Sequence, residues 1–224
     1  MRSRHLLLAG PLAALVFGVG IVALAGMIPS YSQVHQTVSE IGMMGSPARA
    51  PFTLVLCFVA LCLLAFGAAV RSASLERGHS PWAGYLTACM AISAAGVGMF
   101  SYPHPLHNWF GLSELVGYQA PLALAITWRR DPHSASIVRL SWLFTLLMWV
   151  TIVLNLSVLD RTGPLWAYER PIYGLVQRSL FAVFFSWCAA IGLMLFLKRS
   201  RRSVARLSQA PTSARDRARS ASPR

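Results

Sequence analysis

Six apolar runs, each long enough to cross a lipid bilayer, are the feature that most constrains this chain. A helix rises about 1.5 Å per residue, so about 20 apolar residues cross a hydrocarbon layer of roughly 30 Å. A mean hydropathy of +0.54 with only 12% charged residues fits lipid surroundings better than a water-soluble core. We therefore expect an all-α, polytopic transmembrane bundle of six helices over residues 1–197. The runs cover residues 6–28, 51–70, 81–102, 105–128, 137–159 and 171–197.

Basic residues are divided unequally between the two sides that six crossings define. One side collects 16 Lys and Arg residues, and the other side has three. Because loops rich in Lys and Arg stay in the cytoplasm, we predict that both termini are cytoplasmic. The expected location is the cell membrane, as a multi-pass protein of the plasma membrane.

The last segment, 198–224, is rich in Arg and Ser and carries nine basic residues against one acid. This composition predicts a disordered cytoplasmic tail that is attracted to an anionic lipid surface. The rest of the chain has no basic face interleaved with aromatic residues, which argues against a nucleic-acid partner. Membrane lipids are therefore the expected partners.

The longest outer connection, 29–50, is too polar to cross the membrane. Apolar residues recur in it at helical spacing, Thr37 and Glu40 have the spacing of a capping box, and Gly42 is positioned to end a helical turn. We expect a short helix that lies on the outer face or dips into it.

Two ionisable residues lie within the expected helices, Glu114 in the fourth and Arg178 in the sixth. An ionisable group at membrane depth is costly unless it is paired or hydrated. Glu114 lies about 13 Å and Arg178 about 10 Å from the outer starts of their helices. We therefore predict an ion pair between them, with Gln177 nearby, facing the interior of the bundle. The competing interpretation is a buried pair that only fixes the register of the helices.

Histidines form a second candidate site. His104 and His107 lie at the outer start of the fourth expected helix, and His35 lies in the outer connection with Ser39 and Glu40. Imidazole and carboxylate groups are zinc ligands, and three protein ligands with a bound water make a hydrolytic centre. The spacing lacks the H-E-x-x-H signature, and histidines that hydrogen-bond to loop carbonyls at the interface are the competing interpretation.

Short motifs are spread along the six expected spans. They are Thr-Val-Ser-Glu-Ile-Gly at 37–42, Pro103 with His107 and Gly111, and Gly-Leu-Val-Gln-Arg at 174–178. With the six-span layout, these motifs resemble domain of unknown function family 998, a family of uncharacterised multi-pass membrane proteins, over about residues 6–197. The resemblance implies the multi-pass topology and marks Ser39, Glu40, His107 and Arg178 as candidate site residues. It supplies no mechanism.

The function that these observations favour is a binding or accessory protein with an outward-facing polar pocket for a lipid headgroup or another small anionic ligand. Prolines open three of the expected helices on the outer side, and three outward helix N-termini with the Arg178 guanidinium would attract an anion. The candidate ligand-binding residues are Ser39, Glu40, His107, Glu114, Gln177 and Arg178.

Two alternatives stay open. The first is a metal-dependent intramembrane hydrolase, with zinc held by His35, His104 and His107 and with Glu40 or Glu114 as the general base. The second is a proton-coupled transporter centred on Glu114. The sequence does not decide whether the protein is an enzyme.

Overall fold

Helices make up the regular secondary structure of the computed structural model, which describes residues 2–157 and 162–208. Within these residues no strand is present, and seven of the α-helices have nine or more residues. The elements are α1 (Arg2–His5), η1 (Leu6–Leu8), α2 (Ala9–Ala25), α3 (Val38–Ile41), α4 (Arg49–Leu75), α5 (Trp82–Met99), α6 (Pro105–Gly117), α7 (Ala120–Trp128), η2 (Pro132–Ser134), α8 (Ala135–Ser157), α9 (Trp166–Glu169), η3 (Arg170–Ile172) and α10 (Tyr173–Ser208).

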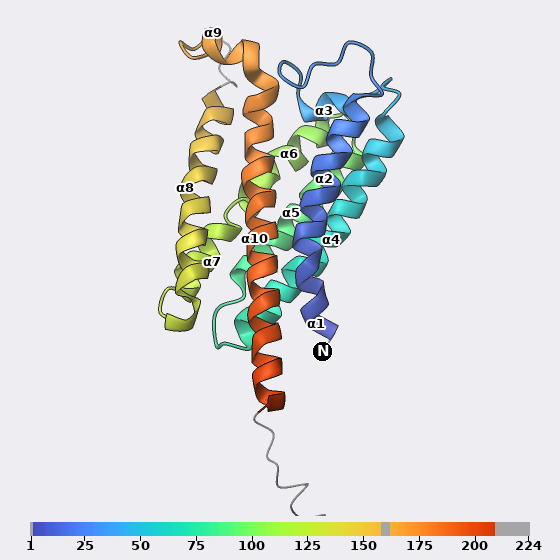
Figure 1. The fold of residues 1–224 in the computed structure, drawn as a ribbon. Coiled ribbons are helices and arrows are strands. Elements are labelled where there is room, and N and C mark those ends of the chain that lie inside the picture. Colours follow the sequence, from blue (N-terminus) through green and yellow to red (C-terminus); the bar gives the residue numbers. More distant parts are fainter. Residues whose placement is uncertain (1, 158–161, 209–224) are drawn as a thin grey trace, which may run out of the picture.

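The long helices form a bundle that closes on itself (Figure 1). Going around it, α2 packs on α4, α4 on α5, α5 on α6 and α7, α7 on α8, α8 on α10, and α10 back on α2. α1 and the last turns of α10 lie at one end, where Arg4 Nη2 donates a hydrogen bond to Ser200 Oγ (3.0 Å). α3 and α9 lie at the opposite end, which we call the α3 end.

Five helical stretches are long and apolar enough to cross a membrane. They coincide with five of the six predicted runs, so an all-α, multi-pass membrane protein is confirmed. Their mean hydropathies lie between 1.3 and 2.7, and half or more of each best window faces away from the protein interior, as lipid contact requires. The stretches are Leu6–Ala25, Arg49–Leu75, Trp82–Met99, Pro132–Ser157 and Trp166–Lys198.

The fourth predicted helix, over 105–128, is two helices, so the prediction of one continuous helix there is wrong. α6 ends at Gly117 and α7 begins at Ala120. Pro121 is the cause, because it has no N–H to donate to the carbonyl of Gly117, and in a continuous helix its ring would clash with that carbonyl. At the break, Gln119 Nε2 donates a hydrogen bond to the Leu115 carbonyl (3.0 Å). α6 and α7 together still lead from the α3 end to the opposite end (Figure 1).

The last helix is longer than predicted. α10 runs to Ser208, so residues 198–208, which the sequence assigned to a disordered tail, are helical. No Pro or Gly interrupts this stretch before Pro211, which removes the usual reason for a helix to end. Lys198 Nζ also donates to the His133 carbonyl (3.0 Å) and so ties α10 to the start of α8. The rest of the predicted tail, 209–224, lies outside the described residues.

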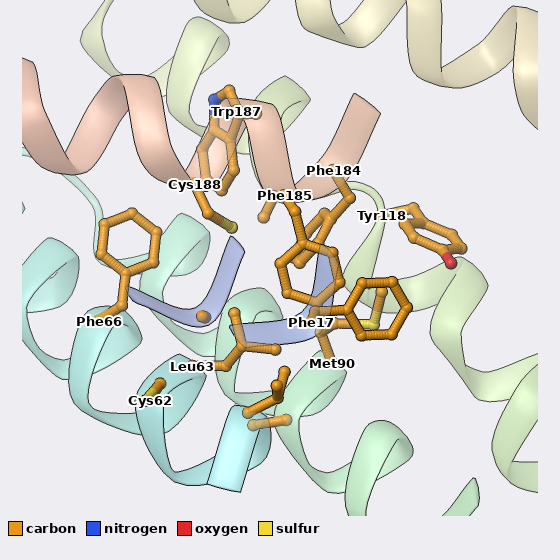
Figure 2. Packing of buried hydrophobic residues seen from close by; sticks show 14 of the residues in the cluster. Phe17, Cys62, Leu63, Phe66, Met90, Tyr118, Phe184, Phe185, Trp187 and Cys188 are labelled. Carbon is orange, nitrogen blue, oxygen red and sulfur yellow. The ribbon is translucent and has the colours of Figure 1, made fainter. Parts of the chain in front are cut away.

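Aromatic and aliphatic side chains fill the middle of the bundle where α2, α4, α5 and α10 meet. Phe17 of α2 stacks on Phe185 of α10 with their ring centroids 4.5 Å apart. Leu63 of α4 and Met90 of α5 lie beside this pair (Figure 2). All four side chains are buried, and they form the floor of the cavity described below.

Candidate functional site

α3 lies in the connection between α2 and α4, and its predicted capping box is confirmed. The Thr37 amide and hydroxyl both donate to Glu40 Oε1, at 2.9 and 3.0 Å. Gln36 Nε2 donates to the other carboxylate oxygen of Glu40 (3.0 Å), and Gly42 is the residue that ends the helix. Both oxygens of Glu40 therefore accept hydrogen bonds from its own segment, which gives this residue a structural role in shaping α3.

Arg178 fastens the loop before α3 to α10. Its Nη1 donates to the carbonyls of Gln33 (2.8 Å) and Gln36 (2.7 Å), and to that of Gly174 in its own helix (2.9 Å). Its Nη2 donates to the Tyr31 hydroxyl (2.6 Å). One guanidinium thus holds three points of the loop formed by residues 26–37, which we call the α2–α3 loop.

Tyr31 and Gln177 complete this fastening. Burial raises the pKa of the Tyr31 phenol, although Arg178 beside it opposes the rise, so the phenol stays protonated and donates to the Thr37 carbonyl (2.6 Å). Gln177 Oε1 accepts a hydrogen bond from the Val38 amide at the start of α3 (2.7 Å). Among the described residues, Arg178 Nε is buried and has no hydrogen-bond partner.

The predicted ion pair between Glu114 and Arg178 is wrong: within the described part of the chain, the two side chains are not in contact. Helical side chains lean toward the N-terminus of their helix, and both helices begin at the α3 end. The long Arg178 side chain therefore reaches up to the loop carbonyls, whereas the shorter Glu114 side chain stays deeper. Glu114 has another partner, since the Tyr118 hydroxyl one turn later donates to its Oε2 (3.0 Å).

His107 connects α3 to α6. Its Nε2 lies 3.1 Å from Ser39 Oγ, and its Nδ1 lies 2.8 Å from the carbonyl oxygen of Phe100. The imidazole is buried, with 5% of its surface exposed. The tautomer follows from the carbonyl, because an oxygen that only accepts requires the proton on Nδ1. In the neutral ring, Nε2 then carries a lone pair, and the Ser39 hydroxyl donates to it.

A cavity lies directly below α3. Its wall contains eleven apolar side chains, and Ser39 and Glu114 are the two polar residues of that wall. The cavity leaves about 30 Å³ for the centres of water molecules, and a single water needs about 10–15 Å³. Ser39 and Glu114 keep part of their surface accessible, whereas most of the apolar wall is buried. The apolar members are Phe17, Val38, Phe52, Leu56, Val59, Leu63, Met90, Ala94, Val97, Phe181 and Phe185.

The three histidines predicted as zinc ligands are not brought together. His35 Nδ1 contacts the carbonyl of Pro171, and His104 Nδ1 accepts a hydrogen bond from the Leu106 amide as the N-cap of α6. His107 turns inward to Ser39. Among the described residues, no group of three or more His, Cys, Asp or Glu side chains has a geometry that could hold a metal ion.

Of the six predicted ligand-binding residues, Ser39 and Glu114 line the cavity. His107 lies outside the wall and contacts Ser39. Glu40, Gln177 and Arg178 form the supports of α3 and its loop. The sequence reasoning missed Tyr31 and Tyr118. The second was detectable, because Glu114 and Tyr118 are four residues apart and so are neighbours on one helical face.

The fold and this site define a multi-pass membrane protein with a partly polar cavity inside its helix bundle. The model of a family described as "Protein of unknown function (DUF998)" matches residues 10–194. The chain therefore belongs to the DUF998 family. No curated protein and no solved structure matches this chain.

Proposed function

We propose that this protein binds a lipid-like molecule in the cavity below α3. The supporting observation is the composition of the wall, in which eleven apolar side chains surround two polar ones, Ser39 and Glu114. Binding sites for small molecules have this pattern, since apolar walls supply affinity and a few polar groups fix the orientation. A ligand with a hydrocarbon body and one polar end matches both parts of the wall.

The polar end of the ligand meets a carboxyl group and a hydroxyl group. A carboxyl group accepts a hydrogen bond whether or not it is ionised, and Ser39 both donates and accepts. These partners favour a hydroxyl, amide or amine on the ligand. Phe181 is the route of entry, because it is the phenylalanine of the wall that is only partly buried. A chain longer than a few carbon atoms requires this side chain to move, since the resting cavity is small.

The anionic ligand that the sequence favoured has weaker support. Arg178 is not part of the cavity wall, and its two terminal nitrogens donate to protein oxygen atoms. Its Nε has no hydrogen-bond partner but is buried, so an anionic oxygen, such as that of a lipid phosphate, reaches this atom only when the α2–α3 loop moves.

The membrane arrangement that goes with this function has six crossings, with α6 and α7 together as the fourth. Both ends of the described chain lie at the same end of the bundle, as an even number of crossings requires (Figure 1). The excess of basic residues at that end assigns it to the cytoplasmic side of the plasma membrane. The basic residues after Leu197 are then on the side where anionic lipids attract them. A reporter enzyme that works only in the cytoplasm should therefore be active when it is fused after Arg224.

Transport is the second candidate function, and the break between α6 and α7 favours it. Transporters bind their substrates beside discontinuous helices, and Glu114 lies one turn before this break. Uptake of a substrate into proteoliposomes that depends on Glu114 and on a proton gradient would favour transport. Binding without uptake would favour the accessory role.

The lipid-binding proposal is tested by native mass spectrometry of the full chain purified in detergent. The wild type is expected to retain a lipid, and Ala94→Leu is expected to lose it because Ala94 lines the cavity. Ala68→Leu makes the same change on the exposed face of α4 and should leave the lipid in place. A wild-type protein without lipid, or equal retention in both folded variants, would contradict the proposal.

A further inference from the structure

Ser39 and His107 form the pair of groups that nucleophilic acyl transfer uses. A hydroxyl oxygen lies 3.1 Å from a ring nitrogen, and the other ring nitrogen lies 2.8 Å from a carbonyl that fixes the orientation of the ring. A nucleophile, a base within hydrogen-bonding reach and a third group that orients the base are the recurring parts of such sites. The capping box of α3 and the hydrogen bond from the Val38 amide to Gln177 hold α3 without the contact between Ser39 and His107.

The position of the pair points to a kind of substrate. Ser39 is itself part of the cavity wall and is one of its two polar residues, so it meets the polar end of a lipid bound there. The Ser39 side chain is partly exposed, whereas the His107 ring behind it is buried. His107 is not part of the wall, so Ser39 is the member of the pair that a molecule in the cavity contacts.

We propose that Ser39 is a nucleophile, with His107 as its general base, that cleaves a carboxylic ester of a lipid held in the cavity. This inference rests on the proposed lipid site, because the acyl chain of the substrate is the part that occupies the apolar wall. It uses no metal ion and is therefore a different chemistry from the zinc hydrolase that the sequence suggested.

The reaction has two steps. Ser39 Oγ bonds to the ester carbonyl carbon while its proton passes to His107 Nε2, and the bond from that carbon to the alkoxy oxygen then breaks as the leaving alcohol takes the proton. In the second step, water adds to the acyl carbon and gives a proton to Nε2. The bond from that carbon to Ser39 Oγ breaks, and Oγ recovers the proton. The sum is ester plus water giving fatty acid plus alcohol, with the serine and histidine regenerated.

A small fluorophosphonate tests the nucleophile directly. The full-length protein in detergent is incubated with the probe, the adduct is measured by intact mass, and its position is mapped by peptide sequencing. The expected result is one adduct per chain, located on Ser39. His107→Gln should slow labelling by about 10²-fold or more, since that is the usual contribution of a general base. Ser46→Ala, which removes a neighbouring hydroxyl that bonds to the Ile41 carbonyl, should leave labelling unchanged.

The mapped adduct on the wild type needs no variant, so a variant that fails to fold does not weaken the test. A folded wild-type protein without an adduct on Ser39 would overturn the inference, as would equal labelling rates in folded wild type and His107→Gln. Lipid retention is measured on the same sample. A protein that retains lipid and is not labelled overturns only the nucleophile, whereas a protein without lipid contradicts the binding site.

Discussion

Replacing Arg178 with methionine removes the fastening of the α2–α3 loop while keeping most of the side chain's length. Methionine donates no hydrogen bond, so the carbonyls of Gln33 and Gln36 and the hydroxyl of Tyr31 all lose their donor. The loop then remains attached at this end of α10 by the hydrogen bond from the Leu175 amide to the Val34 carbonyl (3.3 Å) and by the contact of His35 with the Pro171 carbonyl. The variant therefore isolates the contribution of one guanidinium to the attachment of the α2–α3 loop.

The magnitude follows from the two bonds to loop carbonyls, at 2.8 and 2.7 Å. A hydrogen bond to a charged group contributes about 1.5–3 kcal/mol, so the lower value for each gives a loss of about 3 kcal/mol. The bond to Gly174 is left out because that carbonyl belongs to the same helix. At about 2–4 °C per kcal/mol for a domain of this size, the Tm of Arg178→Met falls by about 6–12 °C.

The assay is thermal unfolding of the purified chain in one detergent, followed by limited proteolysis of the loop. Arg170→Met is the matched control, since Arg170 is exposed just before α10 and surface changes cost less than about 0.5 kcal/mol. Arg178→Lys should give an intermediate Tm, because an ammonium group cannot reproduce the planar fork. Equal Tm values for the two methionine variants, with unchanged cleavage of the loop, would refute the role assigned to Arg178.

Two further predictions concern a close helix contact and a pH-dependent carboxylate. Gly174→Ala should lower the Tm, because an added Cβ would lie 2.6 Å from the Gln33 carbonyl oxygen. Gly111 of α6 faces open space, so Gly111→Ala should raise the stability by about 0.5–1 kcal/mol. A rise in the Tm of both variants would contradict the close packing at Gly174. Desolvation raises the pKa of the Asp131 carboxyl, and hydrogen bonds from Ser134 and the η2 backbone lower it. The lowering is larger than the rise, so the pKa in the folded protein lies below the ordinary 3.8. Its stabilising effect is therefore present above that pH and lost as the pH falls through the lower folded value, so the wild type should lose more Tm than Asp131→Asn between about pH 5 and pH 3. Parallel Tm curves would refute this.

Local patterns in the sequence were enough to predict most helices and the shape of α3. The capping box depends on two residues three positions apart and on a glycine that follows, so no distant contact is needed to see it. Five membrane-spanning stretches follow from length and apolar composition alone. The break after Gly117 was also visible as Pro121, but mean hydropathy averages over a proline and so hides it.

The contacts of the site were beyond this kind of reasoning. Ser39 and His107 are 68 residues apart, and their pairing depends on how α3 sits over the start of α6. Arg178 was predicted to meet a carboxylate because a buried charge needs a partner, and it meets backbone carbonyls instead. A sequence pattern shows which residue carries a charge, whereas every residue carries a carbonyl, so a backbone partner leaves no signal.

The break after Gly117 makes α6 a short helix that carries two groups of the site, His107 and Glu114. Gly117, the last residue of α6, lets this helix approach α5 so closely that an added Cβ would lie 2.6 Å from the Cβ of Met90, a residue of the cavity wall. At the break, Tyr118 holds Glu114. His107 lies on the same short helix as Glu114, so α6 carries the imidazole and the carboxyl group as one rigid unit.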